Sequence, residues 1–307
     1  MPFMFHPVII PLAFWLTVVI RGTCADSPPS VAEVTVSTDI RYRDGPSNSW
    51  RLDLARNKDA AGKPQPAIVV IHGGGWREGD KSSFASRQHG IPGNIVDFAS
   101  LGFVAVTINY RLSREATFPA ALEDCKCAVR WLRAHAKEYH VDPDHIGAYG
   151  NSAGGHLALL LGMADVETVG TENGPYPNYS SRVQAVVSDS GPLDLLSQYR
   201  QGPLRQVIGE FLGGSPEDVR VAAYDQASPL HRISARSPPM LLIYGVEDEQ
   251  VPVATADQFV LALDRTGVKD VSYVRLAKVG HCPHSLVRVP ILRTVVNDFF
   301  RRTLMAR

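Results

Sequence analysis

Two kinds of hydrophobic pattern alternate along this chain. Short apolar runs predict buried strands, and segments with an apolar residue every three or four positions predict amphipathic helices. The predicted strands are AIVVIHG (67–73), FVAVTINY (103–110), IGAYG (146–150), VQAVVSDS (183–190), MLLIYG (240–245) and VSYVRLA (271–277). The clearest predicted helices cover residues 118–139, the segment directly after Ser152, and residues 254–266 and 286–305.

The order of these elements predicts the fold class. Strands and helices follow one another repeatedly, which is typical of an α/β domain with a mostly parallel sheet and helices on both faces. Ahead of them, residues 34–42 and 50–55 flank the turn-forming sequence RDGPSNS and predict a β-hairpin. We therefore expect a single α/β domain over residues 26–307.

Composition and charge restrict the classes of function. The 307 residues are 45% hydrophobic and 20% charged, which is an ordinary globular composition. The 31 basic and 31 acidic residues give a formal net charge of zero. Because this balance gives no excess of positive charge that would attract a polyanion, we expect no nucleic-acid partner.

The N-terminal residues have the pattern of a targeting segment. Val8 to Ile20 is an apolar stretch of signal-peptide length, and Thr23-Cys24-Ala25 offers small residues for cleavage. We predict a signal peptide over residues 1–25, export to the periplasm or the outside, and no stable membrane insertion after cleavage. The alternatives are an uncleaved anchor and lipidation at Cys24, and the absence of Lys or Arg ahead of the apolar stretch weakens the signal-peptide pattern.

The cysteines do not predict disulfides or a metal site. Cys125 and Cys127 lie two positions apart on a predicted helix, so they point to roughly opposite sides and cannot bridge or chelate. We expect Cys125 in the core, Cys127 near the surface and Cys282 as a small packing group. No cofactor or metal is predicted.

The sequence GNSAGG, residues 150–155, offers a nucleophile. It matches G-x-S-x-G, in which small flanking residues permit a strained turn from strand to helix that presents a serine hydroxyl. Here the match begins at the end of a predicted strand and opens a predicted helix. Ser152 is therefore the predicted nucleophile.

A serine nucleophile needs a base and an acid that orients the base. Asp248 follows the predicted strand MLLIYG and His281 follows VSYVRLA, in the chain order serine, acid, histidine. They are the predicted acid and base. Asp194 and the glutamates at 247 and 249 compete for the acid role, and His284 competes for the base role.

The glycine run in HGGGW, residues 72–76, predicts an oxyanion hole. It follows a strand that precedes the nucleophile, where glycine lets backbone N–H groups point at a developing oxyanion. Gly74, Gly75 and Ala153, the residue after the serine, are the predicted donors. Trp76 is expected to pack in the loop.

Taken together, these motifs resemble the α/β-hydrolases of the hormone-sensitive-lipase-like and feruloyl-esterase-like (BD-FAE-type) branch. The resemblance covers the chain from about Trp50 to the C-terminus and implies an eight-stranded sheet, a Ser-Asp-His triad and cofactor-free ester hydrolysis. It places the triad on Ser152, Asp248 and His281. Two departures are Asn151, where many relatives carry Asp, and Ser113-Arg114-Glu115, where Ala-Pro-Glu is more usual.

Residues around these motifs are expected to have structural roles. His156 is expected to be a packing or hydrogen-bonding residue. Tyr110-Arg111 is expected to brace the oxyanion loop, with substrate binding as the alternative. The only places for a lid are residues 170–181 and 194–237, which lack clear apolar stripes and predict an open cleft.

These observations predict a serine carboxylesterase acting through an acyl-enzyme on short-chain esters, with acetyl or feruloyl esters of carbohydrates as candidate substrates. The alternative is an amide-cleaving relative, a formamidase or peptidase with the same triad. A binding protein that has lost the chemistry would need a broken triad, and Ser152 and His281 are both present. The expected partner is therefore a small-molecule or carbohydrate-borne ester, and the sequence does not indicate an oligomeric state.

Overall fold

The computed structural model describes residues 33–58, 62–85, 93–163, 174–282 and 291–305. The predicted signal peptide lies outside these ranges, so cleavage and export stay predictions. Within the described residues, no helix has both the length and the apolar character needed to cross a membrane. The same residues contain no group of three or more His, Cys, Asp or Glu side chains that could hold a metal ion.

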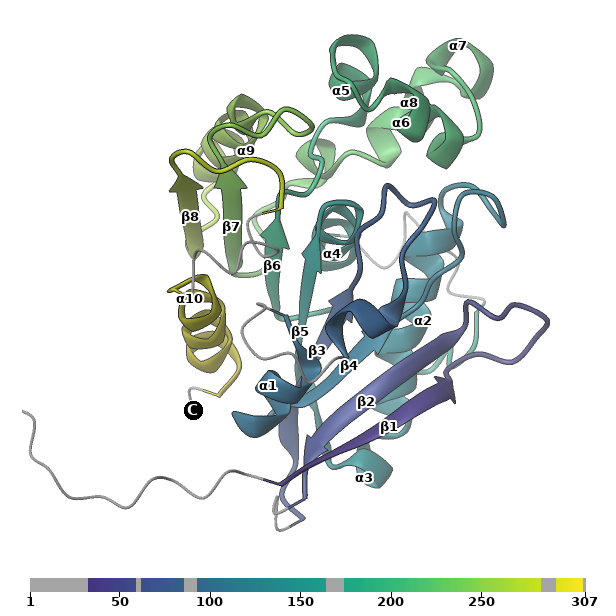
Figure 1. Ribbon diagram of the computed structural model, residues 1–307, viewed down its shortest axis with the longest axis vertical. Helices are drawn as coiled ribbons and strands as arrows, with labels where there is room; N and C mark the ends of the chain where they lie inside the picture. Colours follow the sequence, from purple (N-terminus) through teal and green to yellow (C-terminus); the bar gives the residue numbers. More distant parts are fainter. Residues whose placement is uncertain (1–32, 59–61, 86–92, 164–173, 283–290, 306–307) are drawn as a thin grey trace, which may run out of the picture. The chain divides into compact units, whose positions relative to one another are not determined.

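An eight-stranded sheet forms the centre of the fold, in the order β1-β2-β4-β3-β5-β6-β7-β8 (Figure 1). The first two strands form the predicted antiparallel hairpin, β2 pairs antiparallel with β4, and all later pairs are parallel. The strands are β1 (Val34–Arg41), β2 (Arg51–Asn57), β3 (Gln65–Ile71), β4 (Val104–Ile108), β5 (Val141–Asn151), β6 (Ala185–Asp189), β7 (Met240–Gly245) and β8 (Val271–Leu276). The predicted mostly parallel sheet with eight strands is confirmed.

Helices cover both faces of the sheet and bury two apolar clusters. Alternate residues of β3 point to opposite faces, so Val69 lies in one cluster and Ile68 and Val70 lie in the other. One face is covered by α2 (Ala120–Ala134), α4 (Ala153–Met163) and α9 (Val253–Arg265), and the other by α1 (Ile95–Ser100) and α10 (Ile291–Phe300). Because both faces are covered, the central strands carry continuous buried apolar runs, such as residues 67–71 of β3.

The helix predicted over residues 118–139 begins later and is interrupted. The structure has α2 and then α3 (Ala136–Tyr139), with the predicted first two residues outside the helix. The prediction that Cys127 lies near the surface is wrong. Cys127 is fully buried and its Sγ lies 3.8 Å from the carbonyl oxygen of Tyr42, because the residues after β1 cover the second side of α2.

A group of short helices follows β6 and stands over the carboxyl ends of the strands (Figure 1). We call residues 195–232 the cap. Its helices are α5 (Leu195–Gln201), α6 (Arg205–Leu212), α7 (Pro216–Val219), α8 (Val221–Gln226) and the 3₁₀ turn Pro229–Arg232. The expectation that this region lacks apolar stripes is wrong for α6, which buries Ile208, Phe211 and Leu212. Phe211 stacks on Trp76 at 4.4 Å between ring centroids.

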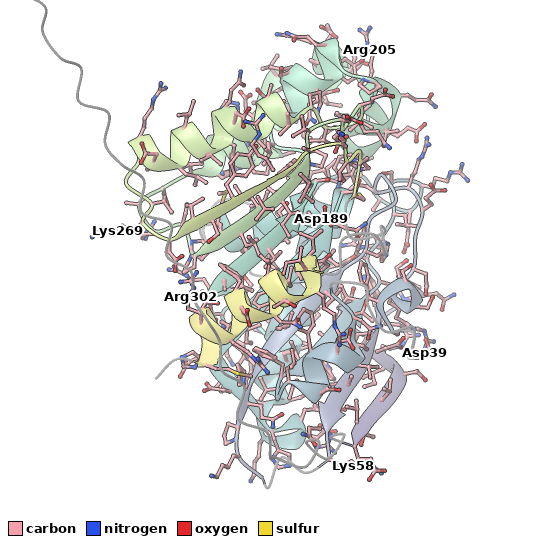
Figure 2. The ribbon with its side chains drawn as sticks, turned by 60° about the vertical axis from the view of Figure 1, so that its left-hand side comes forward. Asp39, Lys58, Asp189, Arg205, Lys269 and Arg302 are labelled. Carbon is pink, nitrogen blue, oxygen red and sulfur yellow. The ribbon has the colours of Figure 1, made fainter. Side chains whose placement is uncertain are left out.

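Two further short elements complete the described chain. A 3₁₀ turn, Lys81–Phe84, follows the glycine-rich loop, and a π-helical turn, Arg301–Met305, continues α10 (Figure 2, where Arg302 is labelled). The first part of the helix predicted at 286–305 lies outside the described residues. Part of the predicted lid loop at 170–181 lies outside them as well.

Candidate active site

The strand-to-helix turn at Ser152 explains the spacing of its motif. β5 ends at Asn151 and α4 begins at Ala153, so Ser152 occupies the turn with a left-handed φ of 51°. A Cβ on Gly150 would lie 2.2 Å from the carbonyl oxygen of Gly154, and a Cβ on Gly154 would lie 2.0 Å from that of Ile71. Only glycine fits at either position, and this lets the strained turn project the serine above the sheet.

A chain of hydrogen bonds joins the three residues predicted for the chemistry. Ser152 Oγ lies 2.9 Å from His281 Nε2, and His281 Nδ1 lies 2.8 Å from Asp248 Oδ2. Asp248 is buried, and its other oxygen accepts backbone hydrogen bonds from Gln250 (2.9 Å) and Val251 (2.8 Å). With Nδ1–H donated to the carboxylate, Nε2 is free to accept the serine proton.

The competing acid residues lie elsewhere. Asp194 caps α5, accepting a hydrogen bond from the backbone N–H of Ser197 at 3.0 Å. Glu247 and Glu249 flank Asp248 but are exposed. His284, the competing base, lies outside the described residues.

The glycine-rich loop after β3 is fixed beside the serine. Gly73 N–H donates to Asn151 Oδ1 at 3.0 Å, and the Tyr110 hydroxyl donates to the carbonyl oxygen of His72 at 3.0 Å. Gly74 has a φ of 107°, and a Cβ there would lie 2.1 Å from the carbonyl oxygen of Glu78. The loop therefore requires glycine at this position. The hydrogen bonds to Asn151 and from Tyr110 fix its conformation from two sides.

Tyr110 braces the loop as predicted, but Arg111 does not. The Arg111 guanidinium binds both oxygens of Asp124 on α2, at 2.8 and 2.9 Å. Asp124 also accepts a hydrogen bond from the Trp50 indole at 3.0 Å. Arg111 therefore ties the end of β4 to α2, and this ion pair replaces the predicted contact with the oxyanion loop.

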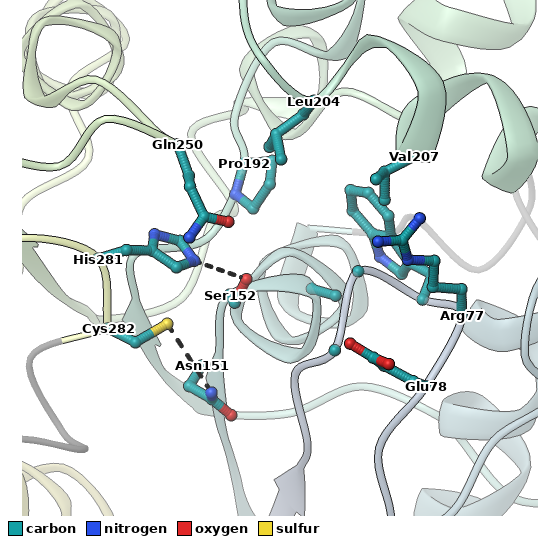
Figure 3. A pocket seen from close by; sticks show the side chains of 14 residues that line it. Arg77, Glu78, Asn151, Ser152, Pro192, Leu204, Val207, Gln250, His281 and Cys282 are labelled. Carbon is teal, nitrogen blue, oxygen red and sulfur yellow. Dashed lines mark hydrogen bonds between the residues drawn. The ribbon is translucent and has the colours of Figure 1, made fainter.

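Ser152 opens into a cavity of about 250 Å³. Figure 3 shows its walls, with His281 and Gln250 on one side and Arg77 and Glu78 on the other. The predicted oxyanion residues Gly74, Gly75 and Ala153 line the same cavity, as do Trp76, Asn151, Pro192, Leu204, Val207 and Cys282. This volume lies just below the usual range of small-molecule sites, and the cavity has polar groups on two walls and apolar groups from the cap.

A family model, BD-FAE, matches residues 52–263, which is more than half of the chain. This chain belongs to the BD-FAE family. The match includes Ser152, Asp248 and the glycine-rich loop, and it stops before His281.

Among curated relatives of this BD-FAE chain, the probable carboxylic ester hydrolase LipM of Mycobacterium tuberculosis is 33% identical over 274 residues. That alignment covers 85% of this chain and 60% of LipM, so the chain spans about 60% of that relative's length. Two solved structures are similar over nearly their full length. A truncated carbohydrate esterase from gut microbiota has a TM-score of 0.72 at 25% identity, covering 91% of this chain and 99% of that one.

The second structure is the Est2 esterase of Thermogutta terrifontis with bound propionate. Its TM-score is 0.68 at 28% identity, covering 90% of this chain and 94% of that chain. The strand order and these neighbours establish the α/β-hydrolase fold. The family resemblance inferred from the motifs is therefore confirmed.

Asn151 has a role in this BD-FAE domain that its sequence position did not reveal. Its Oδ1 accepts from Gly73, and its Nδ2 lies 3.9 Å from the Cys282 sulfur. Cys282 is buried, as expected of a packing group, and its backbone N–H donates to Ser190 Oγ at 3.1 Å. Burial raises the pKa of the Cys282 thiol well above its ordinary value. Asn151 thus connects the glycine-rich loop, the serine turn and the loop that carries His281.

His156 is a hydrogen-bonding core residue, as predicted. Its Nδ1 accepts from the Trp76 indole at 3.2 Å, and its Nε2 lies 2.7 Å from the carbonyl oxygen of Ala227. Burial lowers the pKa of His156 to about 4, so the ring is neutral near pH 7. The cavity-lining residues of the cap and Gln250 carried no sequence signal, because loops and short helices bring them to the site.

Proposed function

We propose that this domain hydrolyses short-chain carboxylic esters through an acyl-enzyme on Ser152. The observation that carries the proposal is the Ser152–His281–Asp248 hydrogen-bond chain at the wall of a cavity that the glycine-rich loop also lines. The esterase names of LipM and Est2 support the same reaction class.

The first half of the reaction forms the acyl-enzyme. His281 Nε2 takes the proton of Ser152 as its Oγ attacks the ester carbonyl carbon, and Asp248 stabilises the resulting imidazolium. The carbonyl oxygen becomes an oxyanion, which the backbone N–H groups of Gly74, Gly75 and Ala153 stabilise. His281 then gives its proton to the alcohol oxygen as the bond from that oxygen to the carbonyl carbon breaks.

The second half repeats these roles with water. His281 takes a proton from a water molecule that attacks the acyl carbon, and the same N–H groups stabilise the second oxyanion. The acid is released when the bond to Ser152 Oγ breaks and His281 returns a proton to that oxygen. Every proton is passed through His281, so the reaction needs no further co-reactant.

We propose acetyl to butyryl groups as the acyl part and a carbohydrate as one class of alcohol. The cavity of about 250 Å³ supports a small acyl group. Solved structures of the similar Est2 esterase contain bound propionate or butyrate, which supports a small acyl group. Another similar protein is named a carbohydrate esterase, which supports a carbohydrate alcohol. Feruloyl esters are a second candidate, which a panel of acetylated and feruloylated polysaccharides distinguishes.

The direct test is Ser152→Ala together with covalent labelling by a fluorophosphonate. We expect the wild type to be labelled and to hydrolyse p-nitrophenyl acetate, and the variant to lose label and several orders of magnitude in kcat. Its stability should change by less than about 1 kcal/mol, because only one hydroxyl is removed. An unlabelled wild type, or a variant that retains turnover, would refute the proposal. Matched ester and anilide substrates separate an esterase from an amidase.

A further inference from the structure

Gln250 lies in the turn that carries the acid residue, and it reaches the cavity from there. Its backbone N–H donates to Asp248 Oδ1 at 2.9 Å, which fixes the main chain at this position. Its side chain lines the cavity together with Ser152 and His281. Figure 3 shows it on the His281 side, with Pro192 and Leu204 beyond it.

The proposed reaction assigns each wall of the cavity to one part of an ester. The leaving oxygen takes its proton from His281 Nε2, so the alcohol part must lie on the His281 side. The oxyanion faces the glycine-rich loop. The acyl chain takes the remaining direction, toward the cap, whose half-buried apolar side chains Leu204 and Val207 lie between the Gln250 and Arg77 walls (Figure 3).

The chemistry of Gln250 suits an alcohol that carries hydroxyl groups. A carboxamide has two donors and one acceptor without charge, so it can both donate to and accept from a hydroxyl. Gln250 is exposed, whereas Leu204 and Val207 are half-buried, so a bulky alcohol part can extend past Gln250 into solvent. A ring with several hydroxyls fits there while its small acyl group points inward.

We propose that Gln250 determines alcohol specificity by hydrogen-bonding a hydroxyl group next to the scissile ester, as in a partly acylated sugar. This inference rests on the proposed ester hydrolysis and names the substrate feature that the site recognises. Charged groups on the opposite wall, Arg77 and Glu78, lie on the oxyanion-loop side (Figure 3). Gln250 is thus a polar side chain on the wall beside the leaving alcohol, whereas the amide of Asn151, which also lines the cavity, contacts Gly73 and Cys282.

The test uses two acetates that differ by one hydroxyl, trans-2-hydroxycyclohexyl acetate and cyclohexyl acetate. Both give the same acetyl-enzyme, so the ratio of their kcat/KM values reports only the alcohol part. We expect Gln250→Leu and Gln250→Ala to lower this ratio about three- to tenfold, the effect of one neutral hydrogen bond. Glu249→Gln is the matched control. Glu249 is exposed and is not among the described residues that line the cavity, so the ratio should not change.

The outcomes separate the inference from the function on which it rests. If the wild type hydrolyses both acetates through Ser152 and the Gln250 variants keep the wild-type ratio, Gln250 does not recognise the hydroxyl. An equal loss on both substrates would mean that Gln250 acts only by supporting Asp248, and this also overturns the inference. If fluorophosphonate labelling and Ser152-dependent turnover are both absent, it is the proposed function that fails. A ratio that falls selectively in both Gln250 variants supports the inference.

Discussion

At the scale of single residues, the environment of Asp248 favours a carboxylate over an amide. The buried carboxylate accepts three hydrogen bonds, from His281 Nδ1 and from the backbone N–H groups of Gln250 and Val251. An amide has only one acceptor oxygen, so it cannot satisfy all three donors. Asparagine would therefore either leave a buried N–H unpaired or present its own NH₂ to the imidazole.

We expect Asp248→Asn to lower kcat by roughly 10⁴-fold, because the NH₂ group favours the histidine tautomer that cannot accept the serine proton. Steady-state kinetics on p-nitrophenyl acetate measure the loss. Asp194→Asn is the matched control, since asparagine caps a helix as well as aspartate does and Asp194 only caps α5. If Asp194→Asn caused the larger loss, the acid would be assigned to the wrong strand.

At the scale of elements, the α6 segment supplies apolar side chains to the cavity. Val207 packs directly over the glycine-rich loop. The contact is so close that a Cβ added to Gly75 would lie only 2.9 Å from Val207 Cγ1. Leu204, one turn earlier, lines the same cavity. The apolar side chains of the wall on the proposed acyl side therefore come from α6 and its N-cap residue, and we expect them to limit the length of the acyl chain.

This wall predicts the acyl-chain preference. We expect the wild-type kcat/KM for p-nitrophenyl acetate or butyrate to exceed that for the palmitate at least about tenfold, since a missing groove forfeits more than 1.4 kcal/mol of transition-state binding. Val207→Ala should raise the octanoate-to-acetate ratio about threefold or more by opening the wall. Val221→Ala, at an exposed position on α8, should leave that ratio unchanged. A wild-type rate that climbs steadily with chain length would contradict the assignment.

Helices and strands could be predicted from the sequence where a single hydrophobic period continues over the whole element. The strands of the sheet and helices α4 and α9 stand out because apolar residues repeat over whole elements. The cap did not stand out, since its helices are four to eight residues long and are separated by Gly-Pro and Gly-Gly sequences. Such short helices are stable only through tertiary contacts, as when Phe211 stacks on Trp76.

The residues of the candidate site also divide into those that could be predicted from the sequence and those that could not. Ser152, Asp248 and His281 were predictable because each follows a strand at the carboxyl edge of the sheet, where this fold gathers its chemistry. Leu204, Val207 and Gln250 were not, because a side chain enters the cavity only through the three-dimensional path of its loop or cap helix. Cys127 was misplaced for a related reason, since helical periodicity cannot show that a second segment covers the outer side of α2.

At the scale of the whole molecule, His156 connects the three parts that build the site. It lies on α4 behind the serine, accepts a hydrogen bond from Trp76 in the oxyanion loop, and bonds the carbonyl oxygen of Ala227 in the cap. Its ring also contacts Phe211 of α6 edge-on, at 5.7 Å between centroids. The neutral ring accepts from Trp76 through Nδ1 and donates to Ala227 through Nε2, so the contact with Trp76 depends on the unprotonated state, whereas an imidazolium would still donate to Ala227.

This dependence predicts how stability changes with pH. Burial lowers the pKa of His156 to about 4, below its ordinary value of 6.5, so the unfolded chain binds this proton more readily than the folded one. The contribution of His156 is therefore complete above pH 6.5 and decreases as the pH falls from 6.5 toward 4. At about 1.4 kcal/mol per pKa unit, it should lower the free energy of unfolding by roughly 2–3 kcal/mol between pH 7.5 and 4.5.

Urea denaturation of the wild type and of His156→Gln at these two pH values measures this effect. Glutamine can donate and accept but does not titrate, so its unfolding free energy should lose roughly 2–3 kcal/mol less than the wild type over the same interval, although the variant is less stable at pH 7.5. His231→Gln is the control, because the His231 side chain is 48% exposed and should leave the wild-type pH dependence in place. Parallel pH profiles for the wild type and His156→Gln would show that His156 takes up its proton in the folded protein. In that case the link between the cap and the oxyanion loop would tolerate a charged ring.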